Sequence, residues 1–201
     1  MIRTLTWFTI GMLALPALAQ EPQRIPAEAA ERVVQFLAPE FAKLASPPLK
    51  VELDPKRAGG ISAGDSRAVL GILDQAFTAE SVKAAKEKPV AVGILLMLGG
   101  VPAVEGKAVP SDRLKVLTIT TPAGEVRKLT VLWLRLKTVD GKLNLEILSN
   151  GDQALLTVPV SEVTGGDSPV VIDPKEATDQ RSKLTLTVLG KWQVTLEAVA
   201  P

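Results

Sequence analysis

The second half of the chain alternates apolar and polar residues in short segments from about residue 114 onward, and turn residues separate these segments. Asp140-Gly141 and Asn150-Gly151 are typical of two-residue β-hairpin turns, and Gly190-Lys191 separates the last two segments. Strands of this length and spacing are typical of antiparallel sandwiches and barrels. The sequence therefore predicts a mainly β fold, an antiparallel β-sandwich or open barrel of about seven to nine strands. The strands expected here are 114–121, 126–137, 142–147, 154–160, 183–189 and 192–199.

An N-terminal segment, residues 20–48, has a different composition, rich in Ala, Glu, Val and Leu, which favours a helix over Ala27–Ala45. Apolar residues recur at helical spacing in it, and we expect the helix to pack this stripe on the following domain. Pro39 should kink the helix or restart it. The stripe comprises Val33, Leu37, Phe41 and Leu44, widened by Val34 and Phe36.

The middle of the chain is less regular. We expect a strand at 49–53, a loop over Asp54–Asp65, and a short helix over 80–88 that begins after an N-cap at Thr78. Periodicity leaves 67–73 open between strand and helix. The region 49–201 is expected to be a single β-rich domain, with a sub-boundary near residue 110 as the alternative.

One uncharged stretch, Pro89–Val104, needs its own interpretation. It is nearly all apolar over 90–97, which favours a fully buried central strand, and a membrane-apposed segment is the alternative. We expect no integral membrane span once the N-terminal segment is cleaved.

Residues 1–19 have the features of a secretory signal peptide. Arg3 supplies a positive charge, Leu5–Leu15 is apolar, and Ala17-Leu18-Ala19 is a small-x-small cleavage site. We therefore expect a secreted or periplasmic bacterial protein cleaved after Ala19. The chain holds 23 Lys and Arg and 22 Asp and Glu; removing Arg3 leaves 22 of each. A balanced charge gives no steering toward nucleic acid, so no nucleic-acid partner is expected.

The chain contains no Cys, no His and no Tyr. Cysteine and histidine chemistry is therefore excluded, including disulfides, Ser-His-Asp triads and thiolate or imidazole metal sites. Gly60-Ile61-Ser62-Ala63-Gly64 matches the G-x-S-x-G pattern of hydrolases, but no histidine exists to activate the serine, and we interpret it as a turn. We expect no catalytic residue, no cofactor and no metal.

Two regions carry a local excess of charge. The connection 161–182 has a net charge of −3 and is interpreted as a solvated loop with a short edge strand at 170–172; a calcium site is the alternative. Residues 113–142 have a net charge of +5. Arg127, Arg135 and Lys137 share one strand face there and are the candidates for binding a partner.

The absence of a catalytic constellation favours a non-enzymatic exported protein of the bacterial envelope, acting as a structural or protein-interaction module with an unknown protein or envelope partner. Two alternatives remain open: a carboxylate- or calcium-dependent hydrolase of envelope polymers, and a membrane-apposed envelope protein.

Overall fold

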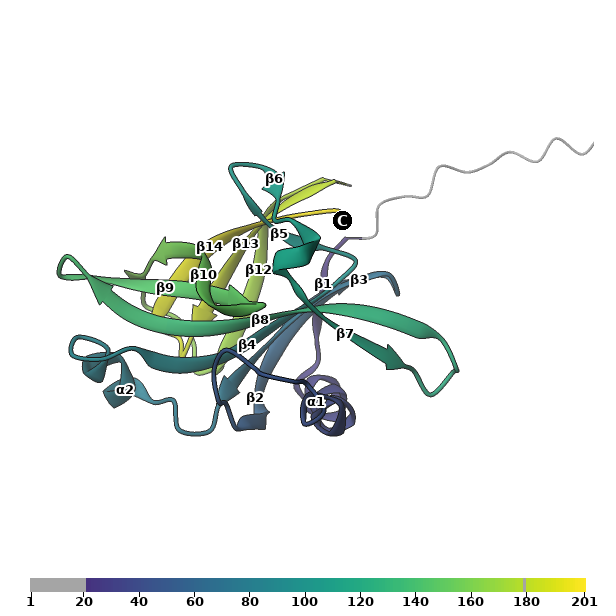
Figure 1. Cartoon of the computed structure of the whole chain (residues 1–201), viewed down its shortest axis with the longest axis horizontal. Coiled ribbons are helices and arrows are strands. Elements are labelled where there is room, and N and C mark those ends of the chain that lie inside the picture. The colour runs from purple at the N-terminus through teal and green to yellow at the C-terminus, as the bar shows by residue number, and fades with distance from the viewer. Residues whose placement is uncertain (1–20, 179) are drawn as a thin grey trace, which may run out of the picture.

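The structure is a computed structural model that describes residues 21–178 and 180–201. The expected signal peptide, 1–19, lies outside these residues. The described chain forms two antiparallel sheets that pack on one another (Figure 1), which confirms the antiparallel β-sandwich. It holds 14 strands, more than expected, because short edge strands form in segments that were interpreted as loops.

Sheet A has eight strands in the order β1-β2-β3-β4-β8-β9-β10, and β7 pairs with β8 beside this path. Its strands are β1 (Gln23–Ile25), β2 (Leu53–Ala63), β3 (Arg67–Asp74), β4 (Val90–Leu98), β7 (Lys115–Thr120), β8 (Val126–Val139), β9 (Lys142–Ser149) and β10 (Gly151–Pro159).

Sheet B has six strands in the order β12-β13-β14-β5-β6, and β11 pairs with β14. Its strands are β5 (Val101–Val104), β6 (Lys107–Ala108), β11 (Ser161–Glu162), β12 (Val170–Ala177), β13 (Arg181–Val188) and β14 (Trp192–Val199). A short 3-10 helix, Ser111–Arg113, leads into β7. The main core lies between the sheets and contains Leu132 and Leu134 of sheet A with Leu186 and Val194 of sheet B.

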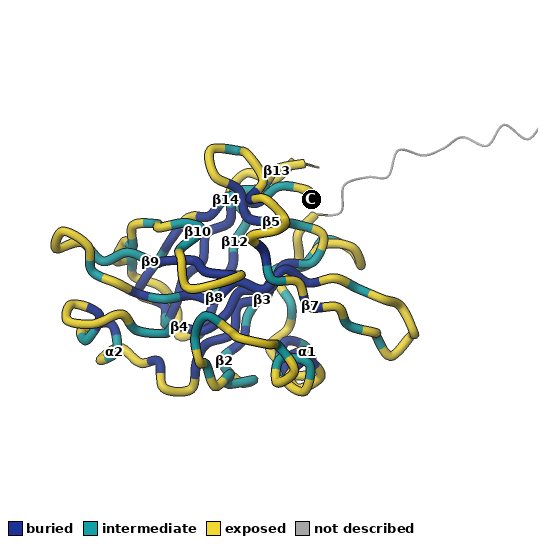
Figure 2. Tube along the Cα trace, in the orientation of Figure 1, coloured by how far each residue is buried: buried dark blue, intermediate teal, exposed yellow. Residues whose placement is uncertain are grey.

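The outer face of sheet A is covered by α1 (Ala27–Phe41), which creates a second core (Figures 1 and 2). The expected helix is confirmed, but it ends at Phe41, two residues after Pro39, instead of at Ala45. Its buried residues are Ala30, Val34 and Leu37, which pack on sheet A.

The expected apolar stripe of α1 was wrong in two members. Val33 is 41% exposed and Phe36 is 40% exposed. Successive helical residues are rotated by about 100°, so Val33 and Val34 cannot both face the sheet. Ala30, Val34 and Leu37, spaced by four and three residues, form the contacting row instead.

The loop expected over Asp54–Asp65 was also wrong, because nearly all of it belongs to β2, which pairs with β3. The strand expected at 49–53 begins only at its last residue, and 67–73 is resolved as a strand, β3. Gly59 and Gly60 suggested a turn, but here they lie inside a strand where other backbone segments approach closely.

Other expectations of the middle region are confirmed. α2 (Ala79–Ala84) begins after Thr78, whose hydroxyl accepts a hydrogen bond from the Ser81 N–H at 3.4 Å, although the helix is shorter than 80–88. β4 lies between β3 and β8 and is buried on both faces, as its apolar run predicts. Within residues 21–178 and 180–201, no helix is long and apolar enough to cross a membrane.

Candidate functional site

The two sheets touch most closely where β12 of sheet B crosses β2 and β3 of sheet A. A Cβ atom on Gly59 would overlap the carbonyl oxygen of Val170, and one on Gly71 would lie 2.9 Å from Val170 Cγ1. Gly59 is therefore required by the close approach of the β12 backbone, and Gly71 makes room for the Val170 side chain. We call this contact, formed by Gly59, Gly71 and Val170, the closed end of the sandwich.

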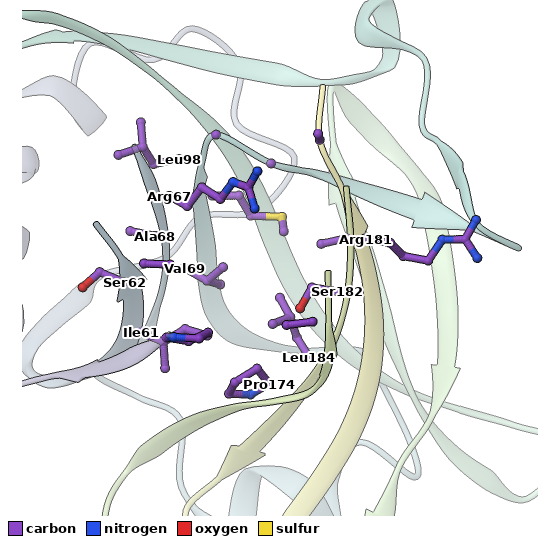
Figure 3. A pocket seen from close by; sticks show the side chains of 18 of the residues that line it. Ile61, Ser62, Arg67, Ala68, Val69, Leu98, Pro174, Arg181, Ser182 and Leu184 are labelled. Carbon is purple, nitrogen blue, oxygen red and sulfur yellow. The ribbon is translucent and has the colours of Figure 1, made fainter. Parts of the chain in front are cut away.

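From Ile61, two residues along β2 from Gly59, and Pro174, four residues along β12 from Val170, the same pair of sheets lines a cavity of about 260 Å³. Figure 3 shows Ile61 and Val69 of sheet A pointing toward Pro174 and Leu184 of sheet B. We call this region the open end. A cavity of about 150 Å³ is enough to bind benzene, so this one has room for a larger apolar group.

Small side chains create the open end. Both sheets contribute alanine, glycine or serine to the lining. Because these side chains are short, they leave space between the sheets unfilled. The small residues that line the cavity are Ser62, Ala63, Ala68, Gly99, Gly100, Ala177, Ser182, Ala198 and Ala200.

Charged groups stand at the rim of this cavity. Figure 3 shows Arg67 extending along the edge of the cavity, whereas Arg181 points away from the cavity. The Arg181 guanidinium lies against the backbone of Gly106. Glu21 also lines the rim. The open end is thus a mostly apolar cavity with Arg67, Arg181 and Glu21 at its rim.

The sequence-derived candidates Arg127, Arg135 and Lys137 lie elsewhere, on β8 in sheet A. Eight residues, or about 26 Å of strand, separate Arg127 from Arg135, and the strand between them is buried. The structure therefore brings Arg135 and Lys137 together but leaves Arg127 apart from them.

Each of these three cations has an acidic neighbour. Arg135 donates to Glu146 Oε2 from Nε at 2.7 Å, and Lys137 Nζ lies 3.7 Å from the other carboxylate oxygen of Glu146. Arg127 pairs with Glu125 and also donates to the carbonyl oxygen of Asp65 at 3.2 Å. These carboxylates offset much of the positive charge that the sequence suggested.

The acidic connection 161–182 is not the solvated loop that was expected. β11 and the whole of β12 fall within it, and β12 is an edge strand that extends beyond 170–172. Asp173 pairs with Arg24 at 2.7 Å and Glu176 with Lys183 at 2.8 Å. In the part of the chain that the structure describes, no three carboxylates gather closely enough to hold a metal ion.

Ser62 of the G-x-S-x-G segment lies in β2, opposite Ala68 of β3 and Gln23 of β1. A hydrolase nucleophile sits at a sharp turn between a strand and a helix, and this serine occupies the interior of a three-strand pairing instead. Residues 60–63 are strand, which corrects our interpretation of the segment as a turn; only Gly64 lies in the turn that follows.

Sequence reasoning missed the open end, although a weak signal exists. Small residues stand near the ends of β4 and β14, beside strand interiors made mostly of larger residues, and the second half of β2 is rich in small residues. Only the pairing of the two sheets shows that these ends face one another across one cavity. No protein-family model matches the chain, and neither the curated proteins nor the solved structures contain a significant match.

Proposed function

We propose that this chain is an exported, non-enzymatic β-sandwich of the bacterial envelope, an interaction module that binds the aliphatic chain of an acidic amphiphile at the open end. The single observation that supports the ligand is the apolar cavity of about 260 Å³ between the sheets. Binding sites for small molecules are concave, mostly apolar and furnished with a few polar groups that orient the ligand.

The chemistry of the rim favours an anionic head group. Arg67 lies beside the cavity interior, and a guanidinium forms two parallel hydrogen bonds with a carboxylate or phosphate. The aliphatic chain would add dispersion contacts with Ile61, Val69 and Leu184, which line the cavity. An envelope supplies such molecules as fatty acids and lipids, which fits the export that residues 1–19 predict.

The binding experiment compares decanoate with decanol on the exported protein, purified after cleavage. We expect saturable binding of both by calorimetry, with decanoate tighter, because the two ligands share the chain and differ in the charge. Arg67→Gln should remove the preference for decanoate. Ala198→Leu should weaken both ligands by roughly tenfold, because the larger side chain fills part of the cavity.

Ala154→Leu is the matched control, because Ala154 lies on β10 and does not line the cavity. Absence of saturable binding, or equal binding by the Ala198 and Ala154 variants, would refute the ligand assignment. Export has a separate test: the periplasmic or secreted protein should begin at Gln20 by mass spectrometry. Cytoplasmic retention of an uncleaved chain would refute the export without affecting the binding result.

A further inference from the structure

β7 is an edge strand with one free side. It pairs with β8, and no other strand in the described part of the chain pairs with it. Figures 1 and 2 show the β7–β8 hairpin projecting from the body of the molecule, with exposed residues toward its tip. A free edge presents unpaired N–H and C=O groups, and it is a template for pairing with another strand.

The hairpin turn shows which backbone groups face the free side. Thr121 donates its N–H to the Glu125 carbonyl at 2.8 Å, so Thr121 and Glu125 form a hydrogen-bonded pair. Such pairs alternate along an antiparallel ladder. Leu117 and Ile119 therefore direct their backbone groups toward β8, and the backbone groups of Val116, Thr118 and Thr120 point outward.

Beyond Lys115 at its first residue, this edge lacks the features that usually protect one. Residues 116–124 contain no charged side chain, and the proline among them lies beyond the end of the strand. Val116 is 45% exposed, and Val126, which pairs with Thr120 on the same hairpin, is 66% exposed. Natural edge strands commonly carry lysine, proline or a bulge to prevent pairing, so this one is open to it.

We propose that the free edge of β7 pairs with the β7 edge of a second copy of this chain, antiparallel about a two-fold axis through Thr118. In this register Thr118 faces its own equivalent, and Val116 faces Thr120 of the second copy. All three outward-facing residues are then paired, which gives about six hydrogen bonds. A slip of two residues leaves one of the three unpaired, so this register satisfies the most backbone groups.

The side chains agree with this register. The two-fold axis is perpendicular to the sheet, so each face of one copy continues into the same face of the other. Leu117, which belongs to the core beneath α1, lies opposite Ile119 of the second copy on that face. The two Lys115 side chains lie at opposite ends of the paired strands, so the like charges stay apart.

Cross-linking tests the register directly, because the chain has no cysteine and a single introduced one is unambiguous. Opposed residues in a hydrogen-bonded pair have Cα atoms about 5.5 Å apart, within the range of a disulfide. Thr118→Cys should form a disulfide-linked dimer under mild oxidation. Val139→Cys, at another partly exposed valine 39% accessible on β8, should form far less.

A charge-swap experiment provides the second measurement, by light scattering on the exported protein. Thr118→Lys and Thr118→Glu should each weaken dimerisation by roughly tenfold or more, because like charges then face one another at the axis. Mixing the two variants should restore the dimer. Val139→Lys adds the same charge elsewhere on an exposed strand position and should leave dimerisation unchanged.

Three results would overturn the proposal: a monomer at every concentration, equal cross-linking of the two cysteine variants, or no effect of Thr118→Lys on dimerisation. Circular dichroism of each variant confirms that it is folded. Capture of an extended segment of another protein by β7, in place of a second copy, would also overturn it. Recovery of the dimer in the Lys and Glu mixture is the result that supports this register specifically.

Discussion

The two ends of one pair of strands differ sharply in how they are packed. At the closed end Gly59 lets the backbone of β12 touch sheet A and Gly71 admits the Val170 side chain, whereas at the open end small side chains of both sheets leave a cavity. Small residues thus have opposite effects in the two places. At the closed end, where the backbone of β12 lies close, small residues allow contact between the sheets. At the open end, where the sheets lie further apart, they leave space.

Adding one methyl group to a glycine at each end should give the largest difference in the free energy of unfolding. Gly59→Ala should destabilise the fold by more than about 3 kcal/mol, because the new Cβ overlaps a backbone carbonyl oxygen that cannot rotate away. Gly100→Ala at the open end places its Cβ 3.7 Å from the nearest atom, an ordinary contact. It should be neutral or stabilise by a few tenths of a kcal/mol.

Urea denaturation of both variants, with the midpoint and slope compared to those of the native chain, measures this contrast. Equal loss of stability in the two variants would show that the closed end is no tighter than the open one. A Gly59 variant as stable as the native chain would contradict the backbone contact itself.

The strands of the second half were predictable because their signals are local. The apolar centre of β8, the β13–β14 pair and the Thr78 cap all follow from alternation, turn residues and hydrogen-bonding capacity within a few positions. β8 has apolar residues on both faces because α1 covers one face and sheet B the other. The sequence therefore predicted the sandwich and its covering helix.

The failures have a common cause, which is contact between distant segments. Gly59 and Gly60 suggest a turn by local rules, yet Gly59 is required by Val170, more than a hundred residues away. Arg135 looked available for binding, but Glu146 on the neighbouring strand pairs with it. The residues that line the cavity come from six strands and the N-terminal segment, and no local pattern combines them.

Two leucines on β13 offer an intermediate contrast, since they are two residues apart on the same face. Both belong to the main core, but only Leu184 also lines the cavity, whereas the Cδ1 of Leu186 lies 3.7 Å from the position of a Cβ on Gly71. Leu186→Ala should cost about 3 kcal/mol and Leu184→Ala about 2 kcal/mol, because a side chain beside a cavity makes fewer contacts. Thermal or urea unfolding resolves the difference, and a larger loss for Leu184→Ala would reverse the comparison.

The smallest expected effect concerns the ion pair between Glu176 of β12 and Lys183 of β13. The Glu176 carboxylate accepts a hydrogen bond from Lys183 and attracts its charge, and together these raise the pKa of Lys183 above its ordinary value of 10.5. A pKa raised by folding stabilises the folded chain below the ordinary value, and the benefit is lost as pH rises through the higher, folded value. The Lys183 side chain is 40% exposed, so solvent screens the pair and the benefit is small.

The Tm of the native chain should therefore exceed that of Lys183→Met by a constant amount from pH 7 to 9, and the gap should close above about pH 10.5. A gap that widens in alkaline solution would mean that the folded chain favours this lysine neutral over charged, which would contradict the stabilising role of the Glu176 carboxylate.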